Sequence, residues 1–89
     1  MNYPVKTLEI KAARMRLGYS QKDVADELGI SASAYEKKER GVAKFSTDEV
    51  FDLAKTLGLS LNQTDDYLLG GRLNVFFANE LPNGRAETV

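Results

Sequence analysis

The residue types that most often carry enzyme chemistry are sparse in this 89-residue chain. It contains no histidine and no cysteine, so it has no imidazole base, no thiol nucleophile, no disulfide and none of the usual zinc ligands. The adjacent carboxylates Asp65 and Asp66 cannot serve as an acid/base pair, because side chains at successive helix positions diverge. The sequence therefore predicts a protein that is not an enzyme and that needs no metal and no cofactor.

Charge is divided unevenly along the chain. Residues 1–44 hold nine Lys and Arg against six Asp and Glu, a net of +3, whereas residues 45–89 hold three against seven, a net of −4. The overall charge of −1, with an isoelectric point near 5.4, counts against nucleic-acid binding by a uniformly charged body. A cationic half, unless it arises by chance, suits a protein that presents one face to phosphates.

Length and hydropathy limit the remaining classes. A chain this short predicts one domain without a large catalytic cleft. The opening residues, MNYPVKTLEIKAARMR, have no apolar run after their charges, and no stretch is long enough to span a bilayer. We expect a cytoplasmic, nucleoid-associated protein with no membrane partner, and nothing in the pattern indicates a small-molecule ligand.

Glycines and serines divide the chain into short helical blocks. The expected helices are Thr7–Leu17, Gln21–Leu28, Ala32–Arg40, Thr47–Leu57 and Leu61–Leu69. Each is followed by a glycine that can end a helix, namely Gly18, Gly29, Gly41, Gly58 and Gly70. Three serines stand three residues before an acidic residue or a glutamine, which is the spacing of a capping box: Ser20 and Asp23, Ser46 and Glu49, Ser60 and Gln63.

Apolar residues recur at helical spacing within these blocks. Those expected to face inward are Ile10, Ala13 and Leu17 in the first block, Val24, Ala25 and Leu28 in the second, Tyr35 in the third, and Val50, Leu53, Ala54 and Leu57 in the fourth. The fifth block is weaker, because Thr64 and Asp65 interrupt its apolar stripe. We predict an all-α domain over residues 1–71, followed by a short extended tail over residues 72–89.

The segment from Gln21 to Arg40 meets the demands of two short helices that cross at a steep angle. Ala25 is the small residue that permits close approach, and Gly29 supplies the turn. The shared apolar patch consists of Val24, Leu28, Ile30 and Tyr35. Ser31 is the expected N-cap of the second helix of this pair.

This segment, GYSQKDVADELGISASAYEKKERG, resembles the helix-turn-helix of the Cro and phage-repressor family, also called XRE-like. The matching positions are Arg14, Gln21, Ala25, Gly29, Ile30, Glu39 and Gly41, and the block FSTDEVFDLAKTLGLSL is similar to the fourth helix and the turn into the fifth. The likeness covers about Leu8 to Leu69. It implies a five-helix, lambda-repressor-like DNA-binding domain and a sequence-specific, repressor-like transcriptional regulator with its third helix in the major groove.

The resemblance also implies roles for individual residues. Base-reading positions are Ala32, Ser33 and Lys37, and phosphate-contacting positions are Gln21, Ser31, Arg40 and Lys44. Arg14 and Glu39 are implied to form a structural ion pair between the first and third helices. Lys38 departs from the pattern, because many relatives have an apolar residue there; its stem is expected to cover Tyr35. Ordinary solvated charge is the alternative for Lys37, Lys38, Arg40 and Lys44.

Two alternatives concern the partners. Residues 73–78, with Leu73, Val75 and Phe77 on one face, either form an edge strand that makes a homodimer or fold back onto the domain's own core. A dimer would place two third helices about 34 Å apart, over a palindromic duplex. The rival to a double-stranded DNA partner is a protein-binding module of the same fold, such as an antitoxin, an anti-repressor or an adaptor, which the acidic isoelectric point favours.

Overall fold

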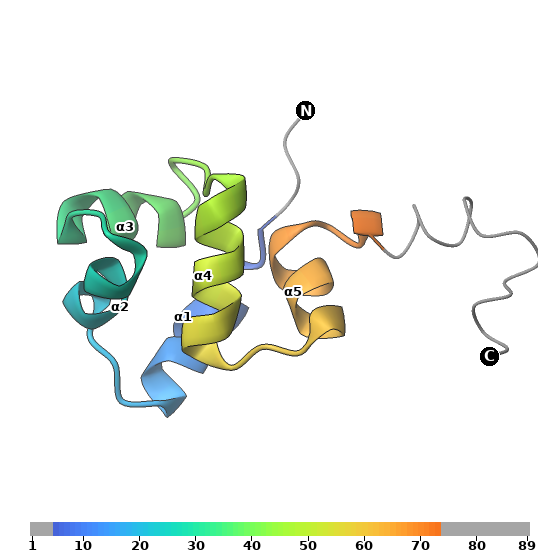
Figure 1. The fold of residues 1–89 in the computed structure, drawn as a ribbon, viewed down its shortest axis with the longest axis horizontal. Helices are drawn as coiled ribbons and strands as arrows, with labels where there is room; N and C mark the ends of the chain where they lie inside the picture. The colour runs from blue at the N-terminus through green and yellow to red at the C-terminus, as the bar shows by residue number, and fades with distance from the viewer. Residues whose placement is uncertain (1–4, 74–89) are drawn as a thin grey trace, which may run out of the picture.

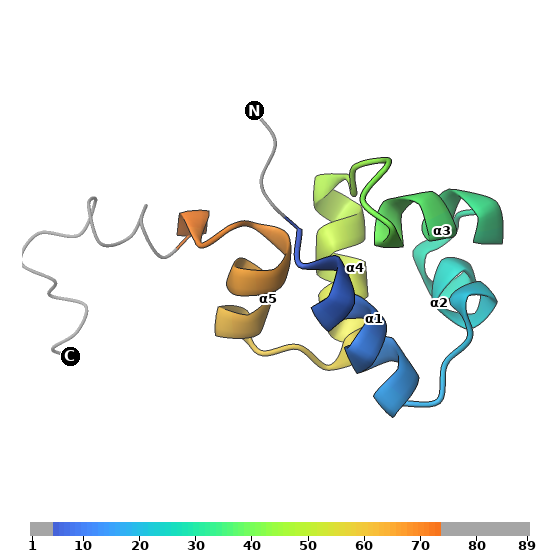
Figure 2. The same cartoon turned by 180° about the vertical axis from the view of Figure 1, so that it is seen from behind.

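The computed structural model describes residues 5–73, and within that range the chain is all-helical, as predicted. The helices are α1 (Thr7–Arg16), α2 (Gln21–Leu28), α3 (Ala32–Glu39), α4 (Thr47–Leu57) and α5 (Leu61–Leu68). Helix α4 stands at the centre, with α2 and α3 at one end of the domain and α5 at the other (Figure 1). Seen from behind, α1 lies in front of α4 (Figure 2), and it packs against α3 and α5.

The predicted helix starts are confirmed at each serine. In α2, α4 and α5 the N-cap serine accepts from the N3 backbone N–H while the N3 side chain accepts from the serine N–H, so all three capping boxes form. Ser31 caps α3 through its side chain alone. Three ends differ by one residue from the prediction: α1 ends at Arg16, α3 at Glu39 and α5 at Leu68, a difference within ordinary fraying.

The core joins all five helices. Its buried apolar residues are Ile10, Ala13, Val24, Ala25, Leu28, Tyr35, Val50, Leu53, Leu57 and Leu68. The prediction for Leu17 was wrong, because this side chain is 49% exposed. Helix α1 ends at Arg16 and the chain turns at Gly18, so Leu17 no longer continues the inward face that Ala13 begins. Ala54, also expected to pack, is only partly buried.

Thr64 and Asp65, expected to interrupt the inner face of α5, are themselves buried. Each is satisfied locally, as buried polar groups must be. The Thr64 hydroxyl donates to the Ser60 carbonyl at 2.8 Å, and Asp65 Oδ1 accepts from the Leu73 N–H at 2.8 Å. The predicted extended tail begins differently from the prediction, because Arg72 and Leu73 are helical. The rest of the tail and of the predicted dimer strand falls on residues 74–89, which lie outside the described residues, so the dimer strand and the domain boundary at residue 71 stay untested.

Candidate nucleic-acid interface

Helices α2 and α3 are joined by three residues whose conformations are set locally. Gly29 ends α2 with φ +72° and ψ +29°. This left-handed conformation is strained for any residue that has a side chain. The Ile30 N–H returns to the Ala25 carbonyl at 3.0 Å, and the Ile30 side chain packs at the edge of the core. Ser31 then accepts from the Ala34 N–H at 3.0 Å. This arrangement confirms the two-helix unit that the segment from Gln21 to Arg40 predicts.

The two sides of α3 differ in burial. Tyr35 and Glu39 face inward and are almost fully buried, whereas Ala32, Ser33 and Lys37 are exposed. The three residues implied to read bases therefore lie on the solvent side of α3, within one turn and a half of its start. They offer a methyl group, a hydroxyl group and an ammonium group to whatever approaches.

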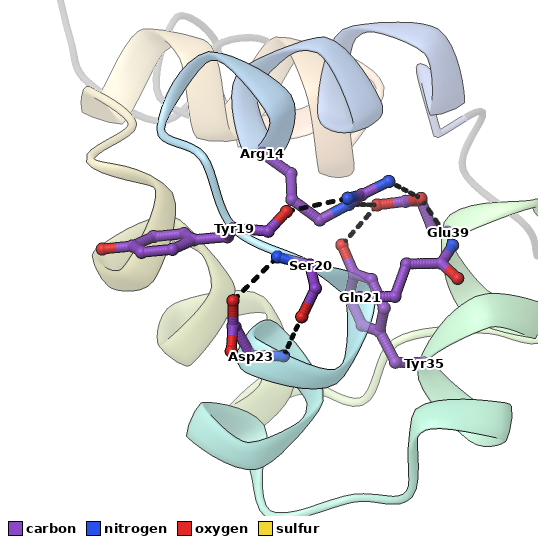
Figure 3. Close-up of polar contacts among 7 residues, drawn as sticks. All are labelled: Arg14, Tyr19, Ser20, Gln21, Asp23, Tyr35 and Glu39. Carbon is purple, nitrogen blue, oxygen red and sulfur yellow. Dashed lines mark hydrogen bonds and ion pairs between the residues drawn. The ribbon is translucent and has the colours of Figure 1, made fainter.

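A buried polar cluster ties the inner side of α3 to α1 and α2 (Figure 3). Arg14 Nε and Nη2 donate to the two carboxylate oxygens of Glu39 at 2.8 and 3.0 Å, and the Tyr35 hydroxyl donates to Glu39 Oε2 at 2.7 Å. Gln21 Nε2 donates to Glu39 Oε1 at 2.9 Å. Arg14 Nη1 reaches the Tyr19 carbonyl at 2.9 Å, so one guanidinium also fixes the chain that enters α2.

Protonation states in this cluster follow from its hydrogen bonds. Burial on its own would raise the pKa of Glu39, but the hydrogen bonds from Arg14, Gln21 and Tyr35 outweigh it and the pKa is lowered. Burial, and next the Glu39 carboxylate, raises the pKa of the Tyr35 hydroxyl far above its ordinary value. Tyr35 therefore remains a donor and Glu39 a charged acceptor at neutral pH. The expected ion pair of Arg14 with Glu39 is present, with two further donors that sequence reasoning missed.

The four residues implied to contact phosphate lie in different settings. Gln21 is half-buried at the first position of α2, with its amide on Glu39. Ser31 is exposed, and its hydroxyl oxygen caps α3. Arg40 is exposed and donates to Glu36, through Nε at 2.6 Å and Nη2 at 3.2 Å. Lys44 is exposed in the loop between α3 and α4.

Two residues of α3 gain importance that their sequence context did not suggest. Glu36 shares the solvent side of α3 with Lys37 and pairs with Arg40, and its spacing of four residues from Arg40 is the signal that could have revealed the pair. Only 16% of the Lys38 side chain is exposed, and its Nζ contacts Glu49 Oε1 at 2.5 Å. Glu49 thus links the α4 capping box to α3.

Carboxylates gather away from this surface, along α2 and α4. A groove of about 610 Å³ is lined by Tyr19, Asp23, Asp26, Glu27, Asp52, Lys55 and Thr56. Three of its four carboxylates belong to the first half of the chain, so the net positive charge of that half does not make it uniformly cationic. Exposed cations lie instead on α3 and in the loop that follows it: Lys37, Arg40 and Lys44.

The fold and this surface define a class: a five-helix domain whose second and third helices form a helix-turn-helix with an exposed outer face. The chain belongs to the helix-turn-helix family of the XRE type, whose family model matches residues 10–63. This is a family of DNA-binding regulatory domains rather than of enzymes. No curated protein and no solved structure matches the chain.

Two features of residues 5–73 bear on other classes of protein. Their helices are all too short or too polar to cross a bilayer. Within the same range, no group of three or more His, Cys, Asp or Glu side chains is arranged so that it could hold a metal ion.

Proposed function

We propose that this protein binds double-stranded DNA in a sequence-specific manner as a repressor-like transcriptional regulator, with α3 in the major groove. The observation that carries the proposal is the contrast between the two sides of α3. Its inner side is held by Tyr35 and Glu39 in the core, and its outer side presents Ala32, Ser33 and Lys37 to solvent. A rigidly seated helix with a free outer face is what groove insertion requires.

The base-reading roles follow from the chemistry of these three side chains. Ala32 can contact a thymine methyl, Ser33 can donate or accept, and Lys37 can donate to guanine O6 and N7. Two of the three are short, so few bases are within their reach. We infer that DNA shape and bridging water add to the specificity.

Phosphate contacts are proposed for Gln21, Ser31, Arg40 and Lys44. Gln21 and Ser31 stand at the starts of α2 and α3, where backbone N–H groups and the helix dipole favour an anion. The amide of Gln21 keeps a second N–H after donating to Glu39, so it can contact a phosphate without leaving the cluster. Arg40 and Lys44 supply exposed positive charge at the far end of α3.

Selection from a randomised duplex pool tests the proposal directly. We expect an enriched site, with an affinity that falls steeply as salt rises because bound phosphates release counterions. If the protein is a homodimer, the site will be palindromic, with half-site centres about 34 Å apart. Failure to enrich any duplex at low salt would refute the proposal. Tight binding to a protein partner that does not weaken with salt would instead support the antitoxin, anti-repressor or adaptor function.

A further inference from the structure

The outer side of α3 carries a carboxylate as well as the three proposed reading groups. Glu36 lies one turn after Ala32 and directly before Lys37, and 39% of its side chain is exposed. With Arg40, Gln21 and Lys11 it lines a shallow groove of about 230 Å³ between α3 and the starts of α1 and α2. Glu36 therefore shares this groove with the proposed phosphate contact at Gln21 and is next to the proposed base-reading residue Lys37 in the chain.

A carboxylate in this position is unfavourable against DNA unless it meets a donor. Phosphates repel its charge, and the hydrogen bond from Arg40 lowers the pKa of Glu36, so the group stays ionised. Arg40 satisfies it unevenly: Nε contacts Oε2 at 2.6 Å, whereas Nη2 contacts Oε1 at the longer distance of 3.2 Å. Oε1 is therefore the more weakly hydrogen-bonded oxygen, and its lone pairs can accept from a second donor.

We propose that Glu36 is a specificity-determining residue that accepts a hydrogen bond from the exocyclic amine of a cytosine, while Arg40 keeps its charge neutralised. This inference rests on the proposed DNA-binding function and deepens it. Ala32, Ser33 and Lys37 supply no dedicated acceptor, and Glu36 does.

A carboxylate favours cytosine over adenine, because both of its oxygens can only accept hydrogen bonds. In the major groove cytosine presents its N4 amine, whereas the N6 amine of adenine lies beside the N7 acceptor. A carboxylate has no proton to offer N7, so adenine would set two acceptors against each other. An amide side chain has both a donor and an acceptor and matches adenine instead.

Parallel selections compare the parent protein with Glu36→Gln, Glu36→Ala and Glu27→Ala. Glu27 is a matched control, because it is an exposed carboxylate on α2 that lines the groove shared with α4. We expect the parent to require cytosine at one position of each half-site and Glu36→Gln to prefer adenine there. Glu36→Ala should lose about tenfold of discrimination at that position alone, since a good base contact contributes this much. Glu27→Ala should enrich the parent site.

Arg40→Ala separates direct reading from an effect transmitted through Arg40. We expect this variant to bind all duplexes more weakly while it retains the cytosine preference. Loss of the cytosine preference in Arg40→Ala, or identical sites for the parent and both Glu36 variants, would overturn the inference while leaving the proposed function intact. If the parent itself enriches no site, the proposed function fails and this inference fails with it. Circular dichroism of each variant is the control that tests whether the helices still form after the surface substitution.

Discussion

At Glu39, donors from α1, α2 and α3 meet one carboxylate. Arg14 is 8% exposed, so removing Glu39 leaves it buried without its counter-charge. We expect Glu39→Ala to lower the free energy of unfolding by about 3–5 kcal/mol, the cost of breaking a buried pair from one side. Urea denaturation measures this loss.

Two further variants provide reference values for the loss of stability in Glu39→Ala. Tyr35→Phe removes one hydrogen bond to a charged group and should cost about 1.5–3 kcal/mol. Glu27→Ala removes an exposed carboxylate and should stay within about 0.5 kcal/mol of the parent. If Glu39→Ala were as mild as Glu27→Ala, the cluster would have no role in holding α3 in place.

Lys37 and Lys44 carry the same charge but are proposed to do different work. Lys37→Ala should relax the base preference at one position of the selected site, because it removes a contact to a base edge. Lys44→Ala should weaken binding to all duplexes alike and reduce the slope of log affinity against log salt by about one. Affinity measured over a salt series, on the selected site and on single-base variants, distinguishes the two. An unchanged base preference in Lys37→Ala would remove Lys37 from the reading set.

At the scale of the elements, the turn between α2 and α3 depends on Gly29. A Cβ built on Gly29 meets nothing within 4 Å, so its φ of +72° is the whole obstacle to substitution. Gly29→Ala should therefore cost about 1–2 kcal/mol, the strain of a left-handed residue with a side chain. Thermal or urea unfolding measures the loss.

Gly58, between α4 and α5, is the matched control. It has φ +67° and equally open space around it, so Gly58→Ala should lose the same stability outside the proposed interface. Gly29→Asn should be milder than Gly29→Ala, because asparagine tolerates this conformation. A Gly29→Ala variant as stable as the parent would show that the turn adopts another conformation.

The contact between Lys38 and Glu49 shows how elements are joined by residues with two roles. Glu49 Oε1 accepts both from the Ser46 N–H, within the capping box, and from Lys38 Nζ. The box could be predicted from spacing alone, because it involves residues three apart. The link to Lys38 could not, because it depends on how close α3 and α4 come in space.

At the scale of the whole molecule, several paired carboxylates make stability depend on pH. The pKa values of Asp23, Glu39 and Glu49 are lowered in the folded protein. A lowered folded pKa means that the stabilisation is present above the unfolded value and is lost as pH falls through the folded value. The ordinary pKa values are 3.8 for Asp and 4.5 for Glu. The stabilisation is therefore lost at pH values below these.

We therefore expect urea midpoints that are level near neutral pH and fall as the pH is lowered below about 4.5. Glu39→Gln should be less stable at neutral pH but should lose less stability on acidification, since the carboxylate that accepts from Arg14, Gln21 and Tyr35 is gone. Denaturation series at several pH values test this expectation. A parent protein that becomes more stable as the pH falls from 5 to 3 would contradict the sign.

The charge distribution also looks different once the helices are packed. Residues 1–44 are net cationic, yet Asp23, Asp26 and Glu27 from this half line the groove against α4 together with Asp52. The division of charge along the sequence therefore does not become a division into two halves of the molecule. What the fold does present is a short run of cations along the outer side and the end of α3.

The sequence by itself determined the helices, their caps and the helix-turn-helix, because these depend on residues a few positions apart. Serine caps, glycine ends and apolar spacing act within one or two turns, and they located all five helices to within a residue. Leu17, Thr64 and Asp65 were misjudged where a chain turn or a local hydrogen bond outweighs the apolar pattern.

Only the tertiary structure decided which side chains meet across helices. Glu39 gathers Arg14, 25 residues away, and Gln21, 18 residues away, and Lys38 reaches Glu49. The same packing leaves Glu36 and its ion pair with Arg40 on the outer side of α3. The contacts of Glu39 and Lys38 depend on distances between helices, which no local pattern encodes.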